Sequence, residues 1–256
     1  MRIIDTCGYI GNWPFRRLTR NTAEEVDKLM QELGADTLFV ASSDAICYKN
    51  PQDGNEALFE ALDGKNFATK FLKFAVIRPG YPGWKHDIDV CIKELGFFGL
   101  EIAPMYHDLT QTEMAEFYAY ASELGVPVRI NTEFENWRQH HRLDDHRVIN
   151  AGMLVPMLKA GDAPLIVNSL SGPNAEFGEI AKARGNIFVD INRVDSFASN
   201  SLEYMAEVMG TDALCVGTRA PFSYGDGNLV KIMFTKMFSD EDREKIAWKN
   251  ISKIIK

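Results

Sequence analysis

Eight apolar segments alternate with eight helix-like segments along the whole chain, and this alternation restricts the fold more than any other feature. Runs such as 37–41 and 71–77 are continuously apolar, as expected for parallel strands that are buried on both faces. Eight consecutive strand–helix units in 256 residues favour a closed (β/α)8 barrel. A doubly wound nucleotide-binding sheet would need a G-x-G-x-x-G turn, which the sequence lacks. We therefore predict an α/β protein with a single TIM-barrel domain over residues 1–256.

The predicted elements follow one another with mostly short connections. Strands are expected at 3–9, 37–41, 71–77, 98–102, 126–131, 165–168, 187–191 and 214–218. Helices are expected at 21–34, 55–62, 84–95, 112–124, 148–159, 175–184, 202–209 and from about 228, with a second helix start at 239. The longest connection is the polar loop from 132 to about 147. Active sites of such barrels lie at the carboxyl ends of the strands, so polar strand-end residues are the first candidates.

Composition excludes several classes of function. The formal net charge of −8 disfavours nucleic acid and anionic membranes as partners. No window approaches 18 uninterrupted apolar residues, and the N-terminus shows no signal-peptide pattern. The four cysteines are widely spaced and form no CxxC pair, as is typical of reduced thiols. We expect a cytoplasmic protein that acts on a small molecule.

The first strand carries the strongest resemblance to a known family. Asp5, Cys7 and Tyr9 alternate and point to one side of the strand, which ends at Gly11. This stretch resembles the opening of the amidohydrolase superfamily, in particular the aminocarboxymuconate-decarboxylase-like branch. There the strand reads Ile-Asp-x-His-x-His, and the two His bind a catalytic metal ion. Cys7 and Tyr9 stand at these two positions here.

The resemblance extends over the whole chain. Residues 165–172 resemble the family's sixth strand, and 216–222 resemble the eighth, which usually reads Gly-Thr-Asp-x-Pro. Residues 244–255 resemble the closing helix, with Asn250 at the family's usual Asn. The resemblance implies hydrolysis or a lyase-type step such as decarboxylation, and leaves open which of the two.

Every position that holds a metal ligand in the family carries another residue here. Those positions are Cys7, Tyr9, Asn131, Asn168 and Arg219. Amides and a neutral phenol are poor ligands for a catalytic zinc ion, and Arg219 adds a fixed positive charge. We therefore predict no metal cofactor and a degenerate metal site. The alternative is zinc or another divalent metal held by an unusual set drawn from Cys7 and loop histidines.

The replacements offer a different chemistry. Arg219 is the best candidate for binding a carboxylate or phosphate, with Arg78 and Arg193 after strands three and seven as additional anion contacts or as ordinary loop arginines. Arg129 and Glu101 are expected to form a buried structural ion pair one layer deeper.

Four strand-end residues are the predicted catalytic set: Cys7, Tyr9, Asn131 and Asn168. Cys7 is either a nucleophile or a small core residue, and the latter is favoured. Tyr9 is either an acid and hydrogen-bond donor or a ring that fills the space of the metal. Asp5 and Asp190 are the carboxylates expected nearby.

All five histidines lie in segments that follow strands. His107 and His141 are predicted to contact the substrate. The loop at 138–147 is interpreted as a lid, a substrate-binding loop, an oligomer contact, an alternative metal site or simply a solvated charged loop. Trp13 and Phe15 are expected to cap the core, with a homo-oligomer interface as the alternative.

Three hypotheses follow. The preferred one is an enzyme, a hydrolase or lyase, that acts on a small anionic metabolite without the usual metal. The second is a catalytically inactive binding or scaffold protein on the same fold. The third is a metal-dependent hydrolase with an unusual ligand set.

Overall fold

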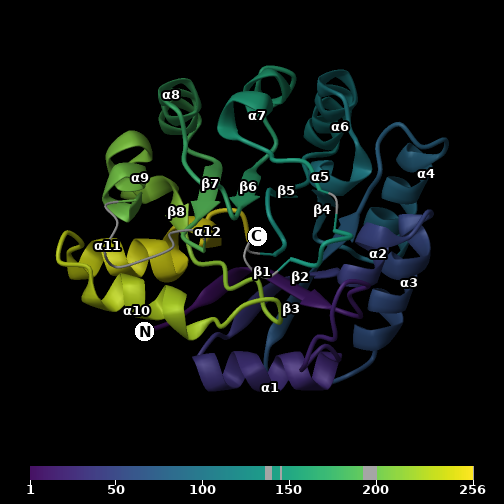
Figure 1. The fold of residues 1–256 in the computed structure, drawn as a ribbon, viewed down its shortest axis with the longest axis horizontal. Coiled ribbons are helices and arrows are strands. Elements are labelled where there is room, and N and C mark those ends of the chain that lie inside the picture. Colours follow the sequence, from purple (N-terminus) through teal and green to yellow (C-terminus); the bar gives the residue numbers. More distant parts are fainter. Residues whose placement is uncertain (136–139, 145, 193–200, 256) are drawn as a thin grey trace.

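The computed structural model describes residues 1–135, 140–144, 146–192 and 201–255. Eight parallel strands follow one another in chain order and form a barrel (Figure 1). They are β1 (Ile4–Ile10), β2 (Thr37–Ser42), β3 (Lys70–Val76), β4 (Gly99–Ile102), β5 (Val128–Asn131), β6 (Leu165–Asn168), β7 (Ile187–Asp190) and β8 (Leu214–Cys215). Bridges from Asp5 to Val216 and from Gly8 to Ala220 join the first strand to the last. The predicted TIM barrel is confirmed.

Helices surround the strands, as Figure 1 shows. The α-helices are α1 (Ala23–Leu33), α2 (Ser43–Cys47), α3 (Pro51–Leu62), α4 (Trp84–Asp89), α5 (Pro104–His107), α6 (Gln111–Leu124), α7 (Ala151–Leu158), α8 (Ala175–Arg184), α9 (Ser201–Met209), α10 (Asp226–Phe234), α11 (Asp240–Glu244) and α12 (Asn250–Ser252). A π-helical turn, Val90–Glu94, continues α4, a second one, Lys245–Lys249, joins α11 to α12, and a 3₁₀ turn, Thr211–Ala213, precedes β8. No described helix is long and apolar enough to cross a membrane.

Local sequence signals explain where the main helices begin and end. Thr22 and Glu25 form a capping box at the start of α1, and Gly34 ends that helix in the left-handed conformation. The sequence prediction placed two helix starts differently. α3 begins at Pro51 rather than at 55, because proline fits the first helical turn, and α7 begins only after Asn150, whose side chain caps it. The short helices α2 and α5, which follow β2 and β4, were not predicted.

The centre of the barrel contains the predicted ion pair between Arg129 and Glu101. Both side chains are completely buried. Two guanidinium nitrogens of Arg129 donate to the Glu101 carboxylate, and a third donates to the carbonyl oxygens of Thr6 and Phe39 at 3.0 and 2.7 Å. The buried structural ion pair is therefore confirmed, and every nitrogen of the guanidinium donates a hydrogen bond.

Candidate active site

The ends of β1, β4 and β5 bring three side chains into one hydrogen-bonded chain directly above this ion pair. The Tyr9 hydroxyl donates to Glu101 Oε1 at 2.7 Å, and Asn131 Nδ2 donates to the same hydroxyl at 2.9 Å. Burial and the adjacent Glu101 carboxylate raise the pKa of Tyr9 well above its usual value. Tyr9 is therefore a neutral phenol whose proton is directed at Glu101.

A second cluster forms at the ends of β6 and β7. Asn168 Nδ2 donates to Asp190 Oδ2 at 2.8 Å, and the Ser169 backbone N–H donates to Asp190 Oδ1 at 2.8 Å. Burial raises the pKa of Asp190 to about 6, although these hydrogen bonds oppose the shift. Among the described residues, Asn168 Oδ1 and Ser169 Oγ are buried without a hydrogen-bond partner. The cluster therefore holds a carboxyl group that titrates near neutral pH beside polar atoms with spare bonding capacity.

Arg219 follows β8 and is almost completely buried, with a side-chain exposure of 8%. Its backbone has a φ of 58°, a left-handed conformation that is unusual for a residue with a side chain. Its Nη1 donates to the Glu133 carbonyl oxygen at 2.9 Å, whereas Nε has no partner among the described residues. Burial lowers the pKa of Arg219, but guanidinium remains charged at any physiological pH.

The predicted catalytic residues and Arg219 share one electrostatic environment. Arg219 lowers the pKa of Asp190, and both Cys7 and Tyr9 act on the pKa of Arg219. Burial raises the pKa of the Cys7 thiol well above its ordinary value, so Cys7 is a protonated thiol at neutral pH. This favours the interpretation of Cys7 as a core residue over that of a nucleophile. The structure thus gathers Cys7, Tyr9, Asn131, Asn168 and Arg219 at one end of the barrel.

An aromatic cluster covers this end. We define it as Trp13, Tyr106, Phe134 and Phe222; Tyr106 belongs to α5, and the other three come from the loops after β1, β5 and β8. Trp13 stacks on Phe134 with ring centroids 5.4 Å apart and meets the edge of Phe222 at 5.1 Å. Phe134 and Phe222 both contact the Tyr9 ring, at 5.0 and 5.6 Å. Trp13 is buried and caps the core as expected, and the rings separate the polar strand ends from solvent.

Arg16 forms hydrogen bonds that connect the loops after β1, β5 and β8. Its Nη2 donates to the Phe222 carbonyl oxygen at 2.7 Å, and its Nε donates to the buried Glu135 carboxylate. The loops after β1, β5 and β8 are thereby linked through one side chain. Sequence reasoning did not single out Arg16, Glu133 or Glu135. Glu133 lies two residues after Asn131, just past the end of β5, so extending the alternation of that strand by one step leads to it.

The other predicted substrate contacts lie elsewhere. Arg78 lies over the Tyr81 ring, with 5.3 Å from Cζ to the centroid. His107 Nε2 donates to the Ile46 carbonyl oxygen at 3.0 Å, and burial lowers the pKa of His107 to about 4. His141 stacks on Phe15 at 6.4 Å. No contact links these three residues to Arg219 in the described part of the chain, and Arg193 lies outside it.

The histidine-rich loop is described in part, without Arg138, Gln139 and Asp145. His140 and His146 pack edge to face, and His146 Nδ1 lies 3.4 Å from the buried Asp144 carboxylate. Among the described residues, no group of three or more His, Cys, Asp and Glu side chains is arranged to hold a metal ion. Neither this loop nor the Cys7 environment therefore provides a ready ligand set within that part of the chain.

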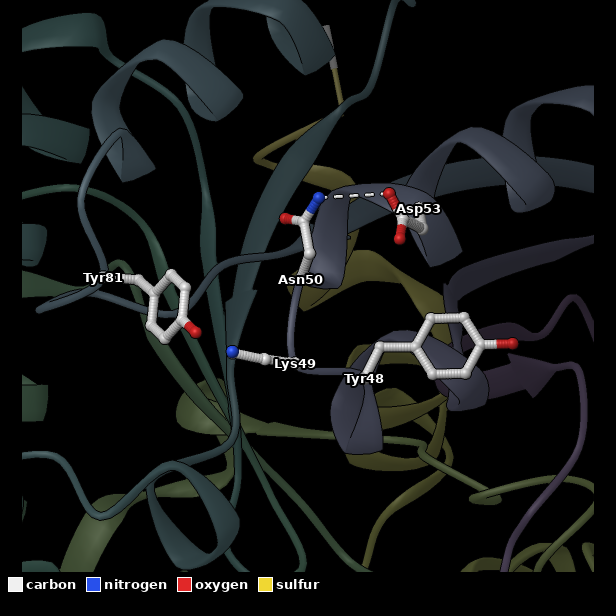
Figure 2. Close-up of a pocket in the computed structure, with 5 residues that line it drawn as sticks. All are labelled: Tyr48, Lys49, Asn50, Asp53 and Tyr81. Atoms are coloured by element: carbon white, nitrogen blue, oxygen red, sulfur yellow. Dashed lines mark hydrogen bonds between the residues drawn. The ribbon is translucent and has the colours of Figure 1, made fainter.

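A separate surface pocket lies beside α3, with a cavity volume of about 490 Å³. Figure 2 shows Tyr48 and Tyr81 at its two sides and Asn50 turned to Asp53, to which its amide donates at 3.0 Å. Lys49 completes the lining. The pocket contains none of the strand-end residues and no buried unpaired charge. We therefore place the candidate site at the barrel end around Arg219.

Comparison with known proteins supports the architecture. No family model matches the chain, and no curated protein matches it. Solved structures do match over nearly the whole length. A 2,6-dihydroxybenzoate decarboxylase complexed with 2,6-dihydroxybenzoate has a TM-score of 0.70 at 15% identity, covering 98% of both chains. The 5-carboxyvanillate decarboxylase of Sphingomonas paucimobilis has a TM-score of 0.70 at 13% identity, covering 99% of this chain and 98% of its own.

A third structure of the same fold contains a metal ion. The dihydroxybenzoic acid decarboxylase of Polaromonas sp. JS666, with bound manganese and the inhibitor 2-nitroresorcinol, has a TM-score of 0.70 at 16% identity. The match covers 96% of that chain and 98% of this one. At such identities the similarity establishes the fold. The chain therefore shares its fold, over its whole length, with these decarboxylases, and the predicted resemblance is confirmed to that extent.

Proposed function

We propose that this protein binds a small carboxylic acid at the barrel end and acts on it without a bound metal ion. The observation that carries the proposal is Arg219, a buried and permanently charged guanidinium whose Nε has no hydrogen-bond partner among the described residues. A buried cation with spare donors is costly unless an anion completes it. A ligand carboxylate supplies both the charge and the acceptors.

The donor chemistry of the site argues against a divalent metal ion. A metal-binding thiol or phenol must lose its proton, but burial raises the pKa of both Cys7 and Tyr9. The Asn131 and Asn168 amide nitrogens face Tyr9 and Asp190. The fixed charge of Arg219 would repel a cation. These residues do not fit the metal of the fold family.

The surroundings favour a ligand with a flat apolar body. The aromatic cluster offers ring faces and edges next to Tyr9, and such rings pack well against aromatic or conjugated molecules. Three structural relatives are decarboxylases named for benzoate or vanillate acids. A small aromatic or unsaturated acid therefore suits both the charge and the wall of the site.

Among reaction classes, a lyase-type step suits the site better than hydrolysis, since no metal-activated water is needed. In a decarboxylation the bond between the ring carbon and the carboxyl carbon breaks, CO₂ leaves, and the electron pair stays on the ring carbon. A proton must then be delivered to that carbon. Asp190, with a pKa of about 6, holds a transferable proton near neutral pH and regains it from water.

A non-catalytic binding protein is the second candidate. The observation that favours it is the closure of the site, because the aromatic cluster and the Arg16 contacts leave the strand ends covered. Turnover separates the two candidates. Incubation with a panel of hydroxybenzoic acids should release CO₂ if the enzyme hypothesis is correct, and stoichiometric binding without turnover would support the binding protein.

The central test is the removal of Arg219. We expect Arg219→Ala to abolish the binding of benzoate, the probe acid, in isothermal titration calorimetry, because the ligand loses its only proposed counter-ion. Arg17→Ala, which removes an exposed arginine of the loop after β1, serves as the matched control and should bind benzoate normally. Unchanged affinity in Arg219→Ala would refute the proposal, as would stoichiometric zinc or manganese in protein purified without chelators.

A further inference from the structure

Helix α10 has one side anchored on the barrel and one exposed apolar side. On the anchored side, Ile232 is completely buried, and the Asn228 amide donates to the Gly217 carbonyl oxygen at 3.1 Å. On the other side, Met233 and Phe234 are 56% and 69% exposed. The helix is therefore fixed in place while large apolar side chains remain in contact with solvent.

The exposed side forms a continuous stripe. Val230 lies three and four positions before Met233 and Phe234, a spacing that places the three side chains on one helix face. Met237, which is 44% exposed, follows just beyond the helix end. We call Val230, Met233, Phe234 and Met237 the α10 patch. The other large apolar residues that are exposed in the described ranges stand singly along the sequence, whereas such a concentration of them marks an interaction surface.

We infer that the α10 patch is the contact surface of a weak homodimer, in which two copies of α10 pack antiparallel around a two-fold axis. Such an axis places the same patch of both copies face to face, so each apolar side chain meets an apolar counterpart. Methionine and aromatic side chains are enriched at the centres of protein interfaces. Gly227 lies on the same helix face, three positions before Val230, and a Cβ at this glycine would meet nothing within 4 Å. The backbone there is open to a second helix.

The charges at the two ends of the patch favour a second copy as its partner. Asp226 lies four positions before Val230 on the same face, and the exposed Lys236 follows the helix end. An antiparallel pair brings Asp226 of each copy to the end that carries Lys236 of the other, whereas a parallel pair would bring like charges together. An anionic surface is disfavoured, because the Asp240 and Glu241 side chains beyond the patch are 99% and 74% exposed.

The size of the patch predicts that the dimer is weak. Four side chains that are already partly covered supply less than the area of about 800 Å² that each partner contributes to a standard interface. The formal net charge of −8 on each copy also opposes association. We therefore expect an equilibrium between monomer and dimer that depends on protein concentration. This inference does not depend on the ligand of the barrel end.

Sedimentation velocity over a concentration series measures this equilibrium. The wild type should shift from monomer to dimer as its concentration rises. Phe234→Asp should weaken association at least about tenfold, because it places a charge at the centre of the apolar contact. Val148→Asp changes a similarly exposed apolar residue before α7, is the matched control and should associate like the wild type. Figure 1 shows α7 and α10 on opposite sides of the barrel.

An exchange of charges tests the antiparallel arrangement. Asp226→Lys and Lys236→Asp should each weaken association about two- to fivefold, because each places like charges together at both ends of the patch. The double variant restores opposite charges at both ends and should associate like the wild type. Failure of the double variant to restore association would overturn the antiparallel pairing of two copies of α10.

Two further results would overturn the dimer itself. One is a wild type that stays monomeric over the whole series, or a dimer that Phe234→Asp leaves unchanged. The other is co-sedimentation of the wild type, but not of Phe234→Asp, with phosphatidylcholine vesicles, which would assign the patch to a lipid surface. Met233→Asp provides a second variant at the same contact, and circular dichroism of each variant checks that the fold is retained.

Discussion

Arg129 and Arg219 are both buried in the same barrel, but the protein surrounds them very differently. Arg129 has hydrogen bonds from all of its guanidinium nitrogens and lies against the Tyr9 and Phe74 rings. Burial is the largest single influence and lowers its pKa, but the combined contributions of Glu101, Tyr9 and Cys7 outweigh burial and raise it. Arg219 has one carbonyl acceptor and a distant carboxylate, and burial lowers its pKa. Arg129 thus stabilises the barrel, whereas Arg219 keeps a donor that the proposed function assigns to a ligand.

The strongest way to break this comparison is to remove the deeper arginine. We expect Arg129→Met to lower the free energy of unfolding by about 3–5 kcal/mol, because Glu101 becomes a buried and unpaired charge. Urea denaturation followed by circular dichroism measures this loss. Combining Arg129→Met with Glu101→Leu should restore much of the stability, and a double variant as unstable as the single one would contradict the ion-pair explanation.

The matched change at the upper arginine should have a smaller effect on stability. Arg219→Met removes one hydrogen bond and a 4.0 Å charge contact, which corresponds to about 1–2 kcal/mol in the same urea experiment. Benzoate binding should nevertheless disappear in this variant. A loss of stability as large as that of Arg129→Met would show that Arg219 is also a structural cation, and would remove the distinction between the two.

The smallest expected effect is the pH dependence of stability that comes from two buried carboxyl groups, Asp5 and Asp190. Burial raises the pKa of both Asp5 and Asp190 to about 6, above their unfolded value, so the folded state holds these protons more tightly. Each group stabilises the fold at low pH, and this contribution is lost as the pH rises through about 6. Between pH 7 and pH 5, the wild type should gain roughly 1 kcal/mol relative to Asp190→Asn. An identical pH dependence of the two proteins would contradict the raised pKa.

The fold was predictable because each strand–helix unit repeats the same local pattern. Apolar runs identified the strands, and side-chain parity correctly placed Arg129 beside Glu101. Tyr9, Asn131 and Arg219 were singled out by the family resemblance and not by parity, and Asn131 does bond to Tyr9. Sequence reasoning could not identify the partners that loops supply. The contacts of Arg16 with Glu135 and Phe222 join residues more than 100 positions apart, and no periodic pattern records them. The roles of the predicted site residues stay predictions until binding is measured.

The connection between the first and last strands has a consequence for how the chain folds. Asp5 accepts hydrogen bonds from the backbone and hydroxyl of Thr218, across 213 positions, and β8 itself has two residues. During synthesis the second edge of β1 therefore stays unpaired until almost the entire chain has been made. Contacts of such long range form slowly, and an unpaired strand edge invites aggregation in the meantime. Until residue 218 has been made, the nascent chain therefore depends on some other contact to shield the open edge of β1.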